Sequence, residues 1–86
     1  MKTLIAIPTY NEFGNIDNLI KSILVEMKNA DILFIDDSSI DGTLELINVY
    51  KKKNAKIKLI LNNKKMGVGN AHINAIYYAY KNNYAL

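Results

Sequence analysis

The stretch I-D-D-S-S-I-D-G-T at residues 35–43 decides the fold of this chain. It continues the apolar run of residues 32–35, whose composition fits a strand buried on both faces. Two adjacent carboxylates, Asp36 and Asp37, follow the strand, and a polar turn then leads into a helical pattern. Open α/β sheets bind ligands at the carboxyl ends of their strands. The stretch therefore predicts a class of fold and the position of a binding site.

Apolar strands, polar loops and helical patterns alternate along the whole chain. Strands are predicted at residues 4–7, 32–35 and 57–61, with the opening of a fourth at 84–86. Helices are predicted at residues 16–27, from 44 to the lysines at 51–53, and at about 70–80. This βαβαβα(β) order predicts an α/β fold with a three-layer, doubly wound parallel sheet. The third strand alternates more, with Lys58 outward, which favours a place near a sheet edge.

Local signals refine these elements. Pro8 is expected to end the first strand, and Asn15 to cap the first helix. Ser39 or Asp41 can cap the second helix, and Asp41 is interpreted as a cap rather than a ligand. One stripe of the third helix carries small residues that let it lie close to the sheet, namely Ala71, Ala75 and Ala79.

Length and composition limit the possible classes of protein. A chain of 86 residues forms one domain at most, and a hydrophobic content of 50% excludes a disordered tail. The chain has no cysteine, so it has neither a disulfide framework nor a cysteine metal site. No run approaches the roughly 20 apolar residues of a membrane span. The first residues are too short for a signal peptide, which favours a cytoplasmic location.

The net charge of +3 comes from lysine without any arginine. Lysines 51–53, 56 and 58 gather around one helix end and the next strand, where lysine suits the last helical turn. A membrane-surface or nucleic-acid patch is the alternative. Specific base and phosphate contacts favour arginine, so we expect no nucleic-acid partner.

Three polar loops follow the three strands, so all three are expected at one edge of the sheet. This brings Glu12, Asp37 and Lys65 toward one crevice. Tyr10 offers a stacking face, and Glu12 is an acceptor for ribose hydroxyls or base N–H groups. The lysine- and glycine-rich loop at 64–69 is either an anion site at a helix N-terminus or a flexible basic loop. Ordinary strand-to-helix loops are the structural alternative.

The two adjacent carboxylates could bind a metal, act as a general base or accept hydrogen bonds from a nucleobase. Neighbouring residues at a strand end point in opposite directions, so only one of them is expected in the crevice. His72 has no partner histidine or cysteine and is interpreted as structural or surface. Three aromatic side chains of the third helix are expected to pack it against the sheet, namely Tyr77, Tyr78 and Tyr80.

Other nucleotide-binding folds do not match. A dinucleotide site needs Gly-x-Gly-x-x-Gly directly after the first strand, and after Gly67 and Gly69 the third glycine position is His72. The chain has no Gly-Lys-Ser/Thr triplet, which excludes a P-loop. A phosphoreceiver domain would carry its acidic pair after the first strand.

The three loops together resemble a known family. P-T-Y-N-E at 8–12, I-D-D-S-S-I-D-G-T at 35–43 and K-M-G-V-G-N-A at 65–71 look like the N-terminal half of a GT-A inverting glycosyltransferase of family 2. The likeness is greatest to the dolichyl/polyprenyl-phosphate mannosyltransferase branch, and it spans the whole chain in order and spacing. It implies a nucleotide-sugar donor bound by Pro8, Tyr10, Glu12, Ile35 and Asp37, with Lys65 near the diphosphate. Asp36 is the less certain neighbour.

The resemblance also points to a metal-binding motif that does not occur in residues 1–86. In the family, the next strand leads into an Asp-x-Asp motif that holds Mg²⁺ or Mn²⁺ on the diphosphate, and no such motif occurs in residues 1–86. No catalytic or metal-binding residue is therefore predicted. Residues 1–86 are interpreted as an incomplete nucleotide-sugar-binding part, inactive alone. The implied acceptor is a polyprenyl-phosphate or a glycan, with membrane association at the cytoplasmic face through missing parts.

Two alternatives stay open. The chain could be a nucleotide-binding or interaction module without catalysis. A GT-A nucleotidyltransferase is the third hypothesis, but that group has a glycine-rich loop after the first strand, and residues 8–14 do not form one.

Overall fold

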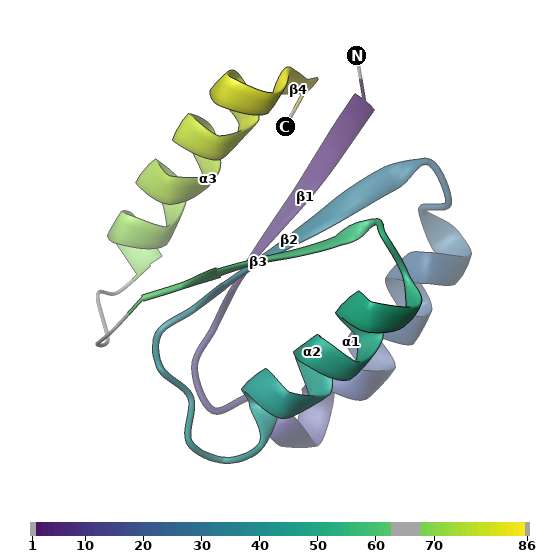
Figure 1. Ribbon diagram of the computed structural model, residues 1–86, viewed down its shortest axis with the longest axis vertical. Coiled ribbons are helices and arrows are strands. Elements are labelled where there is room, and N and C mark those ends of the chain that lie inside the picture. The colour runs from purple at the N-terminus through teal and green to yellow at the C-terminus, as the bar shows by residue number, and fades with distance from the viewer. Residues whose placement is uncertain (1, 63–67, 86) are drawn as a thin grey trace.

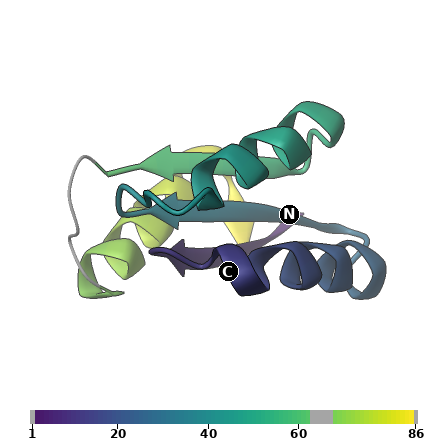
Figure 2. The ribbon, with the colours of Figure 1, turned by 90° about the horizontal axis from the view of Figure 1, so that it is seen from below.

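Four parallel strands and three helices make up the computed structural model, which describes residues 2–62 and 68–85 (Figure 1). The strands are β1 Lys2–Thr9, β2 Ala30–Asp36, β3 Ile57–Leu61 and β4 Tyr84–Ala85. The helices are α1 Phe13–Glu26, α2 Thr43–Lys53 and α3 Val68–Asn82. The strand order is β3-β2-β1-β4, and β1, β2 and β3 point the same way (Figure 2). The predicted βαβαβα(β) order is confirmed.

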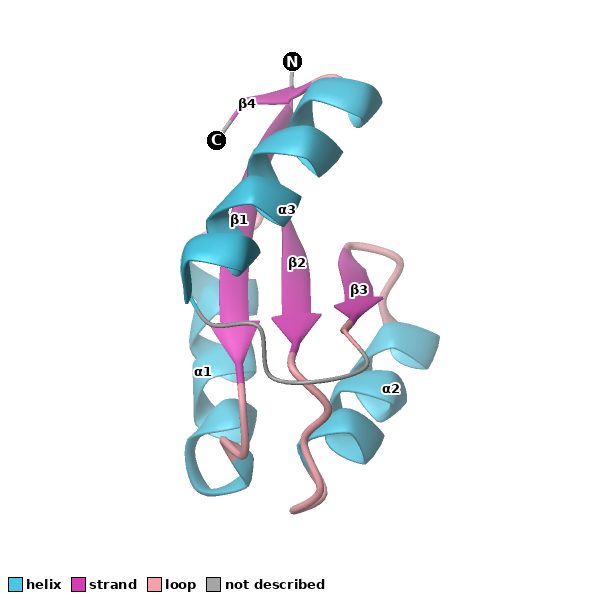
Figure 3. Ribbon diagram, turned by 90° about the vertical axis from the view of Figure 1, so that its left-hand side faces the viewer, coloured by secondary structure: helices cyan, strands magenta, loops and turns pink. Residues whose placement is uncertain are grey.

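The sheet has helices on both faces, as the prediction of a doubly wound fold requires. Helices α1 and α2 cover one face and α3 crosses the other (Figure 3). Successive side chains of β2 alternate between the two cores, so Ile32 and Phe34 face α1 and α2, while Leu33 and Ile35 face α3. Burial of each such side chain contributes about 1.5–3 kcal/mol.

Strand β2 is buried along its whole length, because it lies between β1 and β3 and under both helical layers. This explains its continuous apolar run. Strand β3 lies at the end of the strand order and is only partly buried, which confirms its predicted edge position.

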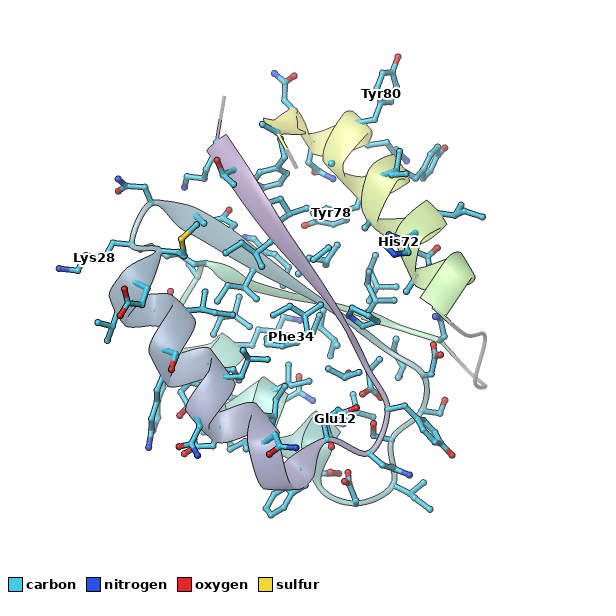
Figure 4. The ribbon with its side chains drawn as sticks, turned by 180° about the vertical axis from the view of Figure 1, so that it is seen from behind. Glu12, Lys28, Phe34, His72, Tyr78 and Tyr80 are labelled. Carbon is cyan, nitrogen blue, oxygen red and sulfur yellow. The ribbon has the colours of Figure 1, made fainter. Side chains whose placement is uncertain are left out.

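Helix α3 packs on the sheet through its small side chains, as predicted. Ala71, Ala75 and Ala79 are all buried in the core on that face. The prediction for the three tyrosines was only partly correct. Tyr78 is partly buried against this core, whereas Tyr77 is 64% exposed and Tyr80 is 85% exposed and points away from the sheet (Figure 4).

Strand β1 does not end at Pro8, and that prediction was wrong. It continues to Thr9, whose carbonyl accepts a hydrogen bond from the backbone N–H of Asp37 at 3.1 Å. The backbone groups of Thr9 therefore face β2, and those of Pro8 face the opposite side. On that side β4 pairs only with Lys2 and Thr3, so the missing N–H of Pro8 removes no ladder bond.

Helix α1 begins at Phe13 and not after Asn15, so the predicted cap was wrong. Glu12 occupies the cap position, and its carbonyl accepts hydrogen bonds from the N–H groups of Asn15 and Ile16 at 3.0 and 2.9 Å. The side chains of Thr43 and Asp41 accept hydrogen bonds from the N–H groups of Glu12 and Phe13 at this helix start, as described below. Hydrogen-bond acceptors from a segment distant in sequence therefore cap this helix in place of the predicted local cap.

The lysines at the end of α2 are exposed, as expected for a solvated helix terminus. No helix within residues 2–62 and 68–85 is long and apolar enough to cross a membrane.

Candidate functional site

The loops after β1 and β2 meet at the carboxyl edge of the sheet (Figure 3). The backbone N–H of Asn11 donates to Ser39 Oγ at 2.8 Å, and the N–H of Ile40 donates to Asn11 Oδ1 at 3.0 Å. This reciprocal pair holds the loop that carries Tyr10 and Glu12 against the loop that carries Asp37. Lys65, the third member of the predicted crevice, lies outside the described residues.

Asp36 is fully buried and serves the protein itself. Its Oδ1 accepts hydrogen bonds from Thr9 Oγ1 at 2.5 Å and Ser39 Oγ at 2.6 Å, and its Oδ2 accepts one from the Ser39 N–H at 2.8 Å. Hydrogen bonds to a charged acceptor are about twice as strong as neutral ones. Asp36 thus ties the end of β1 to the start of the β2–α2 loop.

Asp37 has different partners from its neighbour. Its Oδ1 accepts a hydrogen bond from Asn62 Nδ2 at 2.8 Å, and the residue is 7% exposed. This agrees with the expectation that adjacent side chains at a strand end point apart. Both carboxylate oxygens of Asp36 hold protein donors, so Asp37 is the better candidate for ligand contact, and its role in binding remains a prediction.

Asp41 caps two helices at once. Its Oδ1 accepts hydrogen bonds from the N–H of Thr43 at 3.0 Å and from Thr43 Oγ1 at 2.5 Å, and its Oδ2 accepts one from the N–H of Phe13 at 3.1 Å. Thr43 Oγ1 in turn accepts from the N–H of Glu12 at 2.9 Å. The hydrogen bond from the Thr43 hydroxyl, with help from these N–H groups, lowers the pKa of Asp41. Gly42 and not Asp41 occupies the N-cap position of α2, but the Asp41 side chain accepts hydrogen bonds at both helix starts, as a capping role requires, whereas Ser39 bonds to Asp36 instead.

The two loops contain backbone conformations that non-glycine residues rarely adopt. Asn11 has φ 53°, and Ser38 has φ 61° with its hydroxyl donating to the carbonyl of Asn62 at 2.5 Å. Gly42 has φ 103°, and a Cβ there would lie 3.0 Å from the Phe13 ring. Such conformations cluster at binding sites and persist where the surroundings hold them.

Two predicted site residues meet beside α3. Pro8 and Ile35 are register partners on β1 and β2, and they line a small cavity of about 30 Å³ between the sheet and α3. His72 lines the same cavity, although its side chain is otherwise exposed (Figure 4). Glu12 is half-buried on the other side of β1, in a groove of about 200 Å³ that Pro8 also lines. Tyr10 is 39% exposed.

Sequence reasoning missed the residues that hold the site together, chiefly Thr9, Asn11 and Asn62. Each follows or ends a strand at the carboxyl edge, which was the available signal. Their hydrogen bonds to Asp36, Ser39 and Ser38 join residues 24 to 28 positions apart, so local patterns could not identify them.

The described residues do not form a divalent-metal centre. No three histidine, cysteine, aspartate or glutamate side chains among them are grouped to hold an ion. The buried carboxylate of Asp36 already accepts three hydrogen bonds from hydroxyl and N–H donors, which would compete with a metal for its oxygen atoms.

A doubly wound parallel sheet with polar loops gathered at its carboxyl edge defines an α/β domain of the nucleotide-binding type. The family model described as "Glycosyl transferase family 2" matches residues 4–85, and the chain therefore belongs to glycosyltransferase family 2. The resemblance found in the three loops is thus confirmed.

Two curated relatives are themselves named as glycosyltransferases. The undecaprenyl-phosphate mannosyltransferase of Micrococcus luteus is 29% identical over 73 residues, which cover 85% of this chain and 30% of the relative. The poly(ribitol-phosphate) beta-glucosyltransferase of Bacillus spizizenii is 33% identical over 63 residues, which cover 70% of this chain and 10% of the relative. The chain thus spans about a third or less of the relatives that it matches.

A solved structure shares the fold. The mannosyltransferase PcManGT from Pyrobaculum calidifontis, in complex with GDP-Man and Mn²⁺, superposes with a TM-score of 0.78 at 20% identity. The match covers 91% of this chain and 24% of that one. This supports the prediction of a GT-A nucleotide-binding half.

Proposed function

We propose that residues 1–86 are the nucleotide-sugar-binding part of a glycosyltransferase that moves a hexose from GDP-mannose or a UDP-sugar to a polyprenyl-phosphate or glycan acceptor, with inversion. The observation that carries the proposal is the paired loop at the carboxyl edge, which holds Glu12 and Asp37 in a chain of family 2. The names of the Micrococcus luteus and Pyrobaculum calidifontis relatives support mannose, GDP and a lipid phosphate.

The proposed roles of the residues follow from their chemistry. Tyr10 stacks on the nucleoside, and Glu12 and Asp37 accept hydrogen bonds from its ribose or base. Pro8 and Ile35, which line the small cavity between the sheet and α3, are the proposed apolar contacts of the donor. Lys65 approaches the diphosphate in this proposal, as the resemblance implies.

The proposed transfer displaces the nucleoside diphosphate from the sugar. An acceptor phosphate oxygen attacks the anomeric carbon, and the bond from that carbon to the nucleoside diphosphate breaks. A divalent metal, Mg²⁺ or Mn²⁺, would neutralise the leaving group, but the described residues do not form its site. We therefore propose that the 86 residues bind the donor without turning it over, and that the whole enzyme works at the cytoplasmic face of a membrane.

The test is calorimetric titration of the purified chain with GDP, UDP and GDP-mannose. The unaltered chain should bind at least one of them, and Asp37→Ala should weaken binding by about tenfold or more. Glu45→Ala is the matched control, because Glu45 is an exposed acidic residue on α2. Absence of binding by the unaltered chain, or equal affinity of the Asp37→Ala variant, would contradict the proposal. Robust sugar transfer by the chain alone would contradict its predicted inactivity.

A further inference from the structure

Asn62 directly follows β3 and joins three parts of the site. Its backbone N–H donates to the carbonyl of Asp36 at 2.8 Å, and its own carbonyl accepts from Ser38 Oγ at 2.5 Å. These two bonds continue the sheet and anchor the loop. The side chain makes a separate contact, from Nδ2 to Oδ1 of Asp37 at 2.8 Å.

The orientation of the Asn62 amide follows from its two neighbours. An ionised carboxylate only accepts hydrogen bonds, so the NH₂ group must face Asp37. The Asn62 Oδ1 then faces α3, where Asn74 Nδ2 lies 3.5 Å away. Two successive side-chain hydrogen bonds thus connect α3 with the loop after β2, from Asn74 to Asn62 and from Asn62 to Asp37.

We propose that Asn62 is the positioning residue for Asp37: its amide fixes the carboxylate in the orientation that receives the nucleotide. The inference rests on the proposed function, since it assigns Asp37 to the ligand. An amide donor carries no charge of its own, so the hydrogen bond from Asn62 orients the carboxylate and adds no positive charge to it.

The backbone and side chain of Asn62 can be separated by mutation. Substitution leaves the N–H and carbonyl in place, so the bonds to Asp36 and Ser38 persist. Only the side-chain contacts with Asp37 and Asn74 are removed. Changes in nucleotide affinity can then be assigned to the side chain, provided that thermal unfolding shows a folded variant.

A double-mutant cycle with Asn62→Ala and Asp37→Ala tests the proposal, with GDP and UDP as titrants. We expect Asn62→Ala to weaken binding by about tenfold in the unaltered background. It should have no further effect when Asp37 is already alanine, because the amide then has nothing to orient. Losses that simply add would show that Asn62 acts independently of Asp37 and would overturn the proposal. Asn48→Ala, an exposed asparagine on α2, is the control and should leave affinity unchanged.

A second variant, Asn62→Asp, keeps the size of the side chain and replaces the donor by a carboxylate. Two adjoining carboxylates share a proton more readily as the pH falls. Asp36 is the other acidic group nearby, and its carboxylate already holds Thr9 and Ser39. We expect Asn62→Asp to bind more weakly than Asn62→Ala near pH 7.5 and to recover toward pH 5, and a flat pH profile would overturn the proposal.

The outcomes separate this inference from the proposed function. If Asp37→Ala abolishes binding while Asn62→Ala and Asn62→Asp bind normally, only the role of Asn62 is wrong. If the unaltered chain binds neither GDP nor UDP, both are wrong.

Discussion

Strand β2 carries a buried aspartate at each end, and the two ends use it differently. At the carboxyl end, Asp36 accepts three short hydrogen bonds from Thr9 and Ser39. At the amino end, Asp31 Oδ2 accepts one hydrogen bond, from the Tyr84 hydroxyl at 2.5 Å. Its Oδ1 accepts none from the described residues, and the Lys2 ammonium lies 3.5 Å away.

The difference shows what each end contributes. Directional bonds from neutral donors fix a loop in one geometry, which a binding site requires. At the amino end, one hydrogen bond from the Tyr84 hydroxyl links β4 to Asp31 of β2, and the exposed Lys2 ammonium of β1 adds a less directional attraction to the same carboxylate. The more numerous directional hydrogen bonds therefore lie at the edge of the sheet where the site is proposed.

The largest expected loss of stability follows from removing the Asp36 carboxylate at the carboxyl end of β2. Asp36→Ala leaves the Thr9 and Ser39 donors without their acceptor, and we expect a loss of about 3 kcal/mol in the free energy of unfolding. Asp31→Ala removes fewer bonds and should cost less. Urea unfolding of both variants measures the two values. A larger loss for Asp31→Ala would reverse the comparison.

A smaller loss is expected at Gly42, which lies in the loop that Asp36 anchors. Gly42→Ala forces a side chain into φ 103° and against the Phe13 ring, and should destabilise the protein by about 1–2 kcal/mol. Gly14→Ala is the matched control, because a Cβ there meets nothing within 4 Å and the residue lies in α1. It should stabilise the helix by about 0.5–1 kcal/mol. Thermal unfolding measures both variants. Equal shifts in melting temperature for Gly42→Ala and Gly14→Ala would show that the loop adapts to a side chain at position 42.

The smallest expected effect is at the amino end. Tyr84→Phe removes one hydrogen bond to Asp31 and should cost about 1 kcal/mol at neutral pH. That hydrogen bond also raises the pKa of Tyr84 from 10.0 to about 12. A raised pKa in the folded state means that the stabilisation is complete below pH 10 and is lost as the pH rises toward 12.

Alkaline unfolding measures this loss, and the difference between the two proteins cancels the contribution of the other tyrosines. The stability advantage of the unaltered chain over Tyr84→Phe should shrink between pH 10 and 12. A constant difference in stability between pH 10 and 12 would show that Asp31 does not affect the ionisation of the Tyr84 hydroxyl.

The parts of the fold that were predictable from sequence are those set by local pattern. The continuous apolar run of β2 indicated burial on both faces, and the alanine stripe indicated the packing face of α3. The opposite directions of Asp36 and Asp37 followed from strand geometry. In contrast, the start of α1 was misplaced because Asp41 in the β2–α2 loop and Thr43 at the start of α2 accept hydrogen bonds from it.

Two further errors have the same kind of cause. Pro8 remains in β1 because β4 does not extend along the side that its missing N–H would face, which depends on sheet order and not on composition. Tyr77 and Tyr80 have the apolar character of core residues, but the small alanines of α3 already fill the contact with the sheet. The position of Asn62 against Asp37 depends on the strand order too.

The hydrogen bonds between the loops after β1 and β2 join residues 28 to 31 positions apart. None of them can form before the two strands have paired, so the binding edge and the native sheet arise in the same cooperative step. A nucleotide that binds at this edge would find no corresponding site in the unfolded chain. At 100 times its dissociation constant it would raise the free energy of unfolding by about 2.7 kcal/mol. We therefore expect the proposed binding of a nucleotide to raise the melting temperature of the chain.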